Sequence, residues 1–215
     1  MDHFTGTGLT CVRGDRIIFT GLNFTLNPGE ALVLSGPNGS GKTSLLRVMA
    51  GLSPPTAGII KWRGQAVPDD PVPFFNDIHY LGHQNAVKPA LSVRENLNFY
   101  SALRPSQNDV GEALSTLGLS KFSNLPARLL SAGQTRRVAL SRILCSPASI
   151  WLLDEPFVSL DQDSVEIVYT EITKHRTKGG MVVISTNAPL ELADFKTINL
   201  ETFAYTDRTI WGDII

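Results

Sequence analysis

The sequence is poor in cysteine, in long apolar runs and in net charge, and each shortage excludes a class of protein. Its two cysteines, Cys11 and Cys145, lack metal-binding or haem-attachment spacing and predict buried thiols in a reducing compartment. No apolar run approaches the roughly 18 residues of a membrane-spanning helix. A net charge of −1 provides no basic field, so we expect no nucleic-acid partner. Met1–Gly14 lacks the charged start and apolar core of a secretory signal.

The composition is that of a globular chain, with 42% hydrophobic and 18% charged residues among 215. We expect a single domain over residues 1–215, with a helical insert at about 86–146. Strands alternating with helices predict an α/β fold, with a mostly parallel sheet covered by helices on both faces. Short extended segments near the start, Leu9–Val12, Arg16–Phe19 and Leu22–Leu26, predict an antiparallel β flap beside that sheet.

The remaining elements are predicted from apolar periodicity and from Gly and Pro breakers. Strands are expected at Ala31–Leu34, Ile59–Trp62, Ile78–Leu81, Ile150–Glu155, Met181–Ser185, Thr197–Leu200 and Phe203–Tyr205, with a loop over Gln65–Asp77. Helices are expected at Ser44–Ala50, Ser106–Leu117, Asp161–Lys178 and Pro189–Ala193, and after the capping boxes Ser92–Glu95 and Ser131–Gln134. In the last of these, Val138, Ile143 and Leu144 form the apolar stripe, while Arg136, Arg137 and Arg142 are expected to face solvent.

The most informative stretch is a glycine-rich loop between an expected strand and an expected helix. It matches G-x-x-x-x-G-K-[ST] without a mismatch, which favours a phosphate-binding loop over an ordinary glycine-rich turn. We expect Lys42 to contact the β- and γ-phosphates of a nucleotide and Thr43 to bind Mg²⁺. The residues expected to bind the phosphates are Gly36, Pro37, Asn38, Gly39, Ser40, Gly41, Lys42, Thr43 and Ser44.

Two acids end the apolar strand that follows the insert. Asp154 is expected to hold Mg²⁺, and Glu155 to polarise the water that attacks the γ-phosphate. Gln84, between the two motifs, is expected to bridge Mg²⁺, that water and a neighbouring domain, although a plain polar strand end is an equal alternative. His79 and His83 are four residues apart in a strand-like run, which disfavours a metal site there.

Leu130-Ser131-Ala132-Gly133-Gln134 combines a hydroxyl, a glycine and a helix start, which together make a second anion site. With this pentapeptide the chain resembles the ATP-binding cassette (ABC) family, whose signature has Gly where Ala132 stands. The resemblance covers the whole chain. It implies that ATP lies between the phosphate loop of one copy and Ser131, Gly133 and Gln134 of the other, in a twofold homodimer.

The resemblance also assigns Ser159-Leu160-Asp161 to the dimer contact, and Gln84 to communication with an integral membrane subunit. Two positions depart from the family pattern. Arg13, 23 residues before Gly36, replaces an aromatic that stacks on adenine, and a guanidinium can also stack there. Asn187 replaces the switch histidine. It can donate a hydrogen bond but cannot become a cation, so slowed hydrolysis without loss of ATP binding is expected.

Within the family, the chain is most similar to the ATPases of the haem exporter of cytochrome c maturation. That resemblance implies a CcmB-like membrane subunit with CcmC and the chaperone CcmE nearby, no haem bound directly, and a peripheral position at the cytoplasmic face of the inner membrane, or the matrix face in an organelle. Other cargo, or an ATP-gated dimerising module with weak hydrolysis, remain alternatives. The stretches that carry this similarity are Gly36–Arg47, Ile59–Gly64, Ser131–Leu140, Trp151–Phe157 and Gly179–Ile184.

Overall fold

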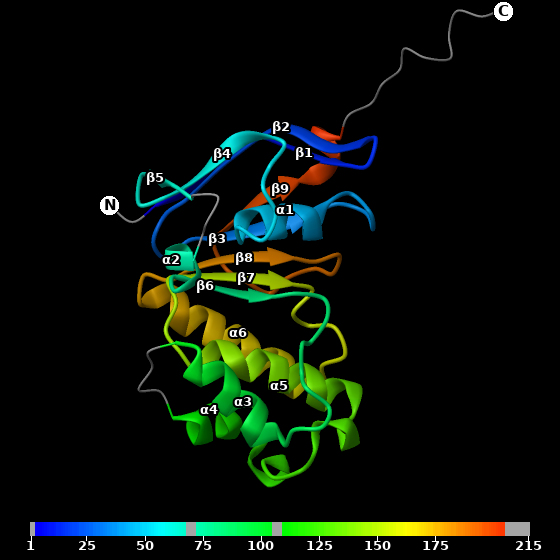
Figure 1. The fold of residues 1–215 in the computed structure, drawn as a ribbon, viewed down its shortest axis with the longest axis vertical. Coiled ribbons are helices and arrows are strands. Elements are labelled where there is room, and N and C mark those ends of the chain that lie inside the picture. The colour runs from blue at the N-terminus through cyan, green and yellow to red at the C-terminus, as the bar shows by residue number, and fades with distance from the viewer. Residues whose placement is uncertain (1–2, 68–71, 105–108, 205–215) are drawn as a thin grey trace, which may run out of the picture.

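The structure is a computed structural model that describes residues 3–67, 72–104 and 109–204 (Figure 1). Its centre is a five-stranded parallel sheet in the order β6-β7-β8-β3-β9. These strands are β3 (Ala31–Ser35), β6 (Ile78–Leu81), β7 (Ile150–Asp154), β8 (Met181–Ser185) and β9 (Phe195–Asn199). The order brings the strand before the phosphate loop to within one strand of the strand that ends in Asp154.

A second, antiparallel sheet has the order β2-β1-β4-β5. It consists of β1 (Phe4–Arg13), β2 (Arg16–Leu26), β4 (Ala57–Trp62) and β5 (Gln65–Ala66). The expected β flap is therefore confirmed, although Arg16–Phe19 and Leu22–Leu26 belong to one strand. Helix α1 (Lys42–Met49) lies between the two sheets (Figure 1).

Helices cover the other face of the parallel sheet. They are α3 (Val93–Ala102), α4 (Val110–Thr116), α5 (Ala132–Leu144) and α6 (Gln162–Thr177), with short 3₁₀ turns η1 (Ser120–Phe122) and η2 (Ala127–Leu129) (Figure 1). The expected α/β architecture is thus observed. The division into one domain with a helical insert over residues 86–146 stays a prediction.

Both faces of the parallel sheet are buried, which explains its continuous apolar strands. Along β7, Ile150 and Leu152 pack toward α1 and the antiparallel sheet, whereas Trp151 and Leu153 pack toward α5 and α6. The period-2 alternation of a strand therefore divides one apolar run between two hydrophobic cores. Cys11 lies buried in the first core and Cys145 in the second, as expected, and neither forms a disulfide.

Three expectations about local structure were wrong. The expected loop over Gln65–Asp77 contains β5, which pairs with β4 across a tight turn, and the short helix α2 (Val72–Phe75). Both turn residues, Arg63 and Gly64, have positive φ, which is typical of a two-residue hairpin turn. Residues 189–193 form no helix, and Phe203 belongs to the 3₁₀ turn η3 (Leu200–Phe203) rather than to a strand.

Specific hydrogen bonds accompany two of these differences. The chain that follows residues 189–192 is held by Arg176 of α6, whose Nη1 and Nη2 donate to the carbonyls of Ala193 and Asp194, at 2.7 and 2.8 Å. At η3 the side chain of Asn199 accepts from the amide of Glu201 at 3.0 Å and starts a turn. The expected start of a helix at Ser106 and the expected strand end at Tyr205 lie outside the described residues.

Candidate nucleotide-binding site

The glycine-rich loop leaves the carboxyl end of β3 and enters α1, as the motif predicts. Gly36, Gly39 and Gly41 all have positive φ, of 131°, 84° and 103°. A Cβ at Gly41 would also lie 2.4 Å from Cγ2 of Ile18. Glycine is therefore required at these turns by backbone conformation and, at Gly41, by the close approach of β2.

The side chain of Lys42 is buried inside the loop. Its Nζ donates to the carbonyl oxygens of Gly36 and Pro37, at 2.6 and 3.1 Å, and to Oδ1 of Asn187 at 2.8 Å. Asn187 lies just beyond β8 and donates from Nδ2 to Oδ1 of Asn38 at 2.7 Å. The fold thus brings the switch position and the phosphate loop into contact.

Asp154 and Thr43 meet at the same edge of the sheet. Thr43 Oγ1 donates to Asp154 Oδ2 at 2.8 Å, and the hydroxyl of Ser185 donates to Asp154 Oδ1. Asp154 is only 2% exposed, so its carboxylate is held by hydrogen bonds in a fixed position. A hydroxyl and a carboxylate are oxygen ligands of the kind that Mg²⁺ prefers.

Glu155 follows in a strained conformation, with φ of 47°. Its backbone N–H donates to the carbonyl and the hydroxyl of Ser185, at 3.1 and 3.2 Å. Burial raises the pKa of Glu155, Asp154 raises it further, and Lys42 and His83 oppose the change. A carboxyl group with a raised pKa beside a phosphate-binding lysine is suited to general-base work.

The expected signature lies at the start of α5, on the opposite face of the parallel sheet from α1 (Figure 1). Ser131 is exposed and caps the helix. Its Oγ accepts from the amide of Gln134, whose side chain accepts from the amide of Ser131. A Cβ at Gly133 would lie 2.6 Å from the carbonyl oxygen of Ser159, which itself has φ of 67°. Signature and expected dimer-contact loop are therefore packed together on one surface.

Two observations test whether this site fits a nucleotide. The hydroxyl of Ser40 is buried and has no hydrogen-bond partner among the described residues, as expected of a loop that holds an anion. A cavity of about 330 Å³ also opens beside the loop, lined by Arg16, Ile17, Ile18, Gly39 and Ser40, with Asp15 and Ala204. The loop and the cavity together fit phosphates and an attached base.

Comparisons with known proteins agree with this geometry. The sequence profile of the ABC transporter family matches residues 19–158. The chain belongs to the ABC transporter family. Two curated relatives are both described as "Cytochrome c biogenesis ATP-binding export protein CcmA". That of Paramagnetospirillum magneticum is 46% identical, with 95% of this chain and 97% of the relative covered. That of Rhodospirillum rubrum is 47% identical, with 94% and 87% covered.

Solved structures of ABC proteins have the same fold. An ABC transporter ATP-binding protein from Pyrococcus furiosus superimposes with a TM-score of 0.80 and 26% identity, over 94% of this chain and all of that one. An ATP-binding cassette solved as a dimer, in a post-hydrolysis state bound to ADP and phosphate, gives 0.77 and 25% identity, over 86% and 88%.

The two departures from the ABC pattern have different surroundings. Asn187 contacts Lys42, as described above. Arg13 is exposed at the end of β1 and does not line the cavity beside the loop, whereas Arg16 and Ile18 do. Sequence reasoning missed Arg16 and Ile18, and no local pattern would have placed them beside the loop. The part of Arg13 in ABC-type nucleotide binding stays a prediction.

Gln84, another predicted residue of the ABC site, lies in the segment after β6, and His79 lies within β6. Gln84 is exposed, three residues beyond Leu81. His79 is buried, with Nε2 2.8 Å from the carbonyl oxygen of Ser146, and burial lowers its pKa to about 3. The described residues contain no cluster of three or more His, Cys, Asp or Glu side chains placed to hold a metal ion.

One expectation about α5 was wrong, and it concerns this ABC site. Arg136 does not face solvent but is 4% exposed, with its guanidinium against the ends of β6 and β7. The arginine was misplaced because an amphipathic pattern assigns charges to the outer face, whereas backbone carbonyls from distant segments surround this one. Arg137 and Arg142 are partly buried.

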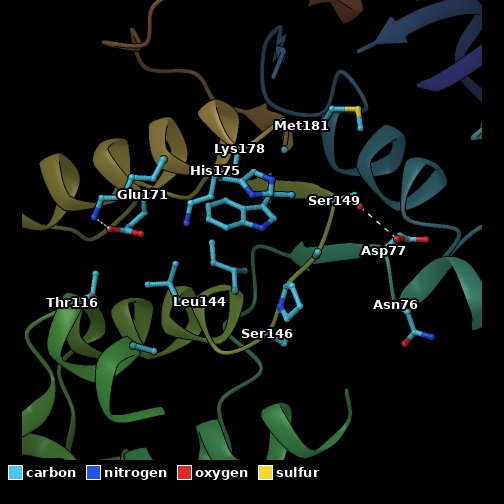
Figure 2. A pocket seen from close by; sticks show the side chains of 18 of the residues that line it. Asn76, Asp77, Thr116, Leu144, Ser146, Ser149, Glu171, His175, Lys178 and Met181 are labelled. Carbon is cyan, nitrogen blue, oxygen red and sulfur yellow. Dashed lines mark hydrogen bonds and ion pairs between the residues drawn. The ribbon is translucent and has the colours of Figure 1, made fainter. Parts of the chain in front are cut away.

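A cavity of about 930 Å³ lies away from the ABC site (Figure 2). It opens at the amino ends of β7 and β8, near Ser149 and Met181, so it lies at the opposite edge of the sheet from the phosphate loop. Trp151 and His175 stack there, with ring centroids 4.0 Å apart, and burial lowers the pKa of His175 to about 4.

No helix among the described residues has the length and hydropathy needed to cross a bilayer.

Proposed function

We propose that this chain is the ATP-hydrolysing subunit of an exporter that acts in cytochrome c biogenesis. The observation that carries the proposal is the meeting of Lys42, Asp154 and Asn187 at one sheet edge, beside a loop with a buried, unpartnered hydroxyl. Similarity to CcmA proteins over most of their length supports the export role. Release of a haem-loaded chaperone is the step that this role implies.

Each residue of the loop has a proposed part in hydrolysis. The loop amides and Lys42 hold the phosphates of ATP, and Lys42 exchanges its carbonyl partners for phosphate oxygens. Glu155 accepts a proton from the attacking water. Asn187 orients the γ-phosphate by a hydrogen bond. Thr43, Asp154 and Gln84 would hold Mg²⁺, which neutralises phosphate charge when bound.

We further propose that two copies close around two ATP molecules. Ser131 is exposed, and it lies on the surface that also carries Ser159. In a twofold dimer, Ser131, Gly133 and Gln134 of one copy would face the phosphate loop of the other. The solved dimer of a related cassette supports this assembly.

The membrane partner is proposed to dock in a groove between β6 and α3. This groove, of about 340 Å³, is lined by Leu52, Tyr100, Leu103 and Arg104 together with Ala86 from the segment that contains Gln84. Leu103 is 64% exposed and Leu52 43%, an unusual apolar rim for a surface. A CcmB-like subunit fits this groove, with CcmC and CcmE nearby, and the chain then lies on the cytoplasmic face of the membrane, or on the matrix face in an organelle. Those partners, rather than this chain, are proposed to bind haem.

The proposal is tested in a strain that lacks its own CcmA. The chain is expected to restore haem-stained cytochromes c and to co-purify with the CcmB-type subunit, whereas Lys42→Ala restores neither haem staining nor phosphate release from ATP. Leu103→Asp should lose co-purification but keep ATP binding. Phosphate release without restored cytochromes c would favour a cassette for another cargo. ATP-driven dimerisation with barely any phosphate release would favour an ATP-gated dimerising module, the alternative that Asn187 suggests because it replaces the switch histidine.

A further inference from the structure

Arg136 is a buried charge that the proposed reaction does not use. Its Nη2 donates to the carbonyl oxygens of Asp154 and Glu155, both at 2.8 Å. Its Nε donates to the carbonyl oxygen of Pro156 at 3.4 Å. These three carbonyls belong to the backbone that carries the Mg²⁺-binding and general-base side chains. Because Glu155 has a positive φ, its backbone needs neighbours to hold it, and Arg136 and Ser185 are those neighbours.

The other arm of the same guanidinium reaches a second segment. Nη1 donates to the carbonyl oxygen of Gly82 at 3.1 Å and to Oδ1 of Asn85 at 3.0 Å. Gly82 and Asn85 flank Gln84, the proposed link to Mg²⁺ and the membrane partner. A single planar group thus joins the end of β7 to the segment after β6.

Arg136 itself is carried by the signature helix. It lies five residues after Ser131 in α5, so a displacement of the helix start displaces the guanidinium. Burial lowers the pKa of Arg136, but Asp154 and Glu155 raise it, and a guanidinium remains charged in proteins. A charged, planar five-donor group suits several carbonyls at once, which a lysine ammonium cannot match.

We propose that Arg136 is a positioning residue that couples the signature helix to Glu155 and to the segment of Gln84 in the same chain. This inference rests on the proposed function, because in the closed dimer Ser131 serves the ATP of the partner copy while Glu155 serves its own. ATP bound to one copy therefore sets the position of the general base in the other, through α5 and Arg136.

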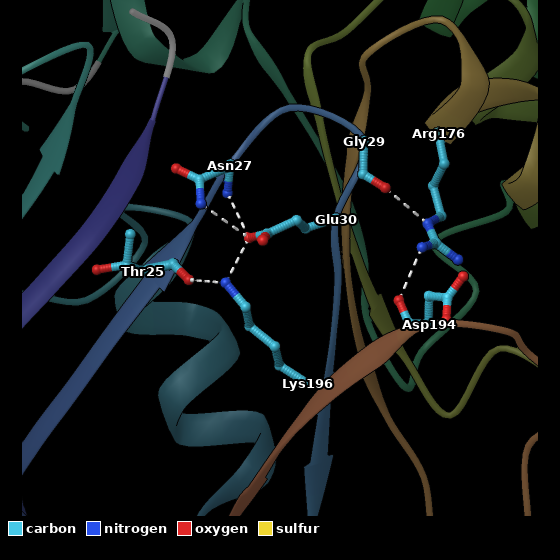
Figure 3. A network of polar contacts seen from close by, with 7 residues as sticks. All are labelled: Thr25, Asn27, Gly29, Glu30, Arg176, Asp194 and Lys196. Carbon is cyan, nitrogen blue, oxygen red and sulfur yellow. Dashed lines mark hydrogen bonds and ion pairs between the residues drawn. The ribbon is translucent and has the colours of Figure 1, made fainter.

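The chain contains a matched control in Arg176 (Figure 3). This guanidinium also donates to three backbone carbonyls, those of Gly29 at 2.9 Å, Ala193 at 2.7 Å and Asp194 at 2.8 Å. The nearby contact of Lys196 with Glu30, at 2.6 Å, belongs to the same network. Arg176 joins α6 to the starts of β3 and β9, far from the phosphate loop along those strands, so it reports the cost of losing a carbonyl clamp without a catalytic consequence.

The experiment compares Arg136→Lys and Arg136→Met with Arg176→Lys and Arg176→Met in the full-length protein. Thermal midpoints, the Kd for a fluorescent ATP analogue, and kcat and KM for Mg-ATP are measured for each. Both pairs should lower the thermal midpoint. The Arg136 variants should keep Kd and KM within about threefold but lose about 100-fold in kcat, the typical effect of misplacing a catalytic group by about 1 Å. The Arg176 variants should keep kcat.

A double-mutant cycle with Glu155→Gln separates positioning from damage to the fold. If Arg136 acts through Glu155, Arg136→Lys should change the residual rate of Glu155→Gln by less than threefold. The inference is overturned if the two losses multiply, or if Arg136 variants that bind the analogue hydrolyse ATP as fast as the Arg176 variants. Should the unaltered protein neither hydrolyse ATP nor dimerise with it, the proposed function fails first, which is a separate result.

Discussion

Glu155 is the residue on which the proposed reaction depends, because its carboxyl lies beside Lys42 with a raised pKa. We predict that Glu155→Gln lowers kcat by about 10²- to 10⁴-fold, the usual contribution of a general base, and leaves ATP affinity nearly unchanged. Phosphate release and nucleotide binding measure the two quantities. An unchanged kcat would remove Glu155 from the mechanism.

The pH profile of kcat gives a second test at this residue. A base must be ionised to accept a proton, and burial favours the protonated form of Glu155. The rate should therefore fall as pH decreases, at a pH above the usual range of an exposed glutamate. The acid limb should be absent in Glu155→Gln, whose residual rate serves as the control.

Asn187 replaces a group that could carry charge, and its contacts to Lys42 and Asn38 show that it reaches the phosphate loop. We predict that Asn187→His raises kcat by about tenfold, because one hydrogen bond from a charged donor is worth about 1.5 kcal/mol or more. Asn187→Ala should lower kcat. Equal rates for wild type and Asn187→His would contradict this role.

Residues with a local signature could be predicted from sequence, and residues held by distant contacts could not. The glycine-rich loop is defined by spacing along one short stretch, so its position between a strand and a helix was expected correctly. Arg136 was assigned to solvent, because its acceptors come from Gly82 and the Asp154–Pro156 segment, which no local pattern places around α5. Arg13 and Arg16 differ in the same way, since only the fold shows which one lines the cavity.

At the scale of elements, α3 and α5 both begin with a capping box, but only the one at α5 belongs to the proposed ATP site. Capping boxes form at Ser92 with Glu95 and at Ser131 with Gln134. Ser92→Ala should cost about 1 kcal/mol of unfolding free energy and leave the ATPase rate unchanged. Ser131→Ala should cost a similar amount but also lower kcat, because we propose that its hydroxyl faces the ATP of the partner copy. Urea unfolding and phosphate release distinguish the two effects, and equal ATPase rates would place Ser131 outside the site.

The elements themselves were predictable where periodicity and caps are local. Strands β3, β6, β7 and β8 and the starts of α3 and α5 were expected within a few residues of their observed bounds. The last part of the described chain was not. There Arg176 of α6 holds the carbonyls of Ala193 and Asp194, which no local pattern indicates, and Asn199 starts a turn by accepting from the amide of Glu201.

In the proposed dimer, each copy contributes half of two ATP sites rather than one complete site. Lys42 lies at the phosphate loop and Ser131 starts a helix on the other face of the sheet, so one copy cannot enclose a nucleotide with both. Variants Lys42→Ala and Ser131→Arg should each be inactive alone. In a mixed dimer, however, the intact loop of the Ser131→Arg copy meets the intact signature of the Lys42→Ala copy. Mixing equal amounts should restore up to roughly a quarter of the wild-type rate, since half of randomly formed dimers contain one intact site of two. Each variant alone, at the same total protein concentration, is the control. If the mixture is as inactive as each variant alone, the two copies do not share their sites.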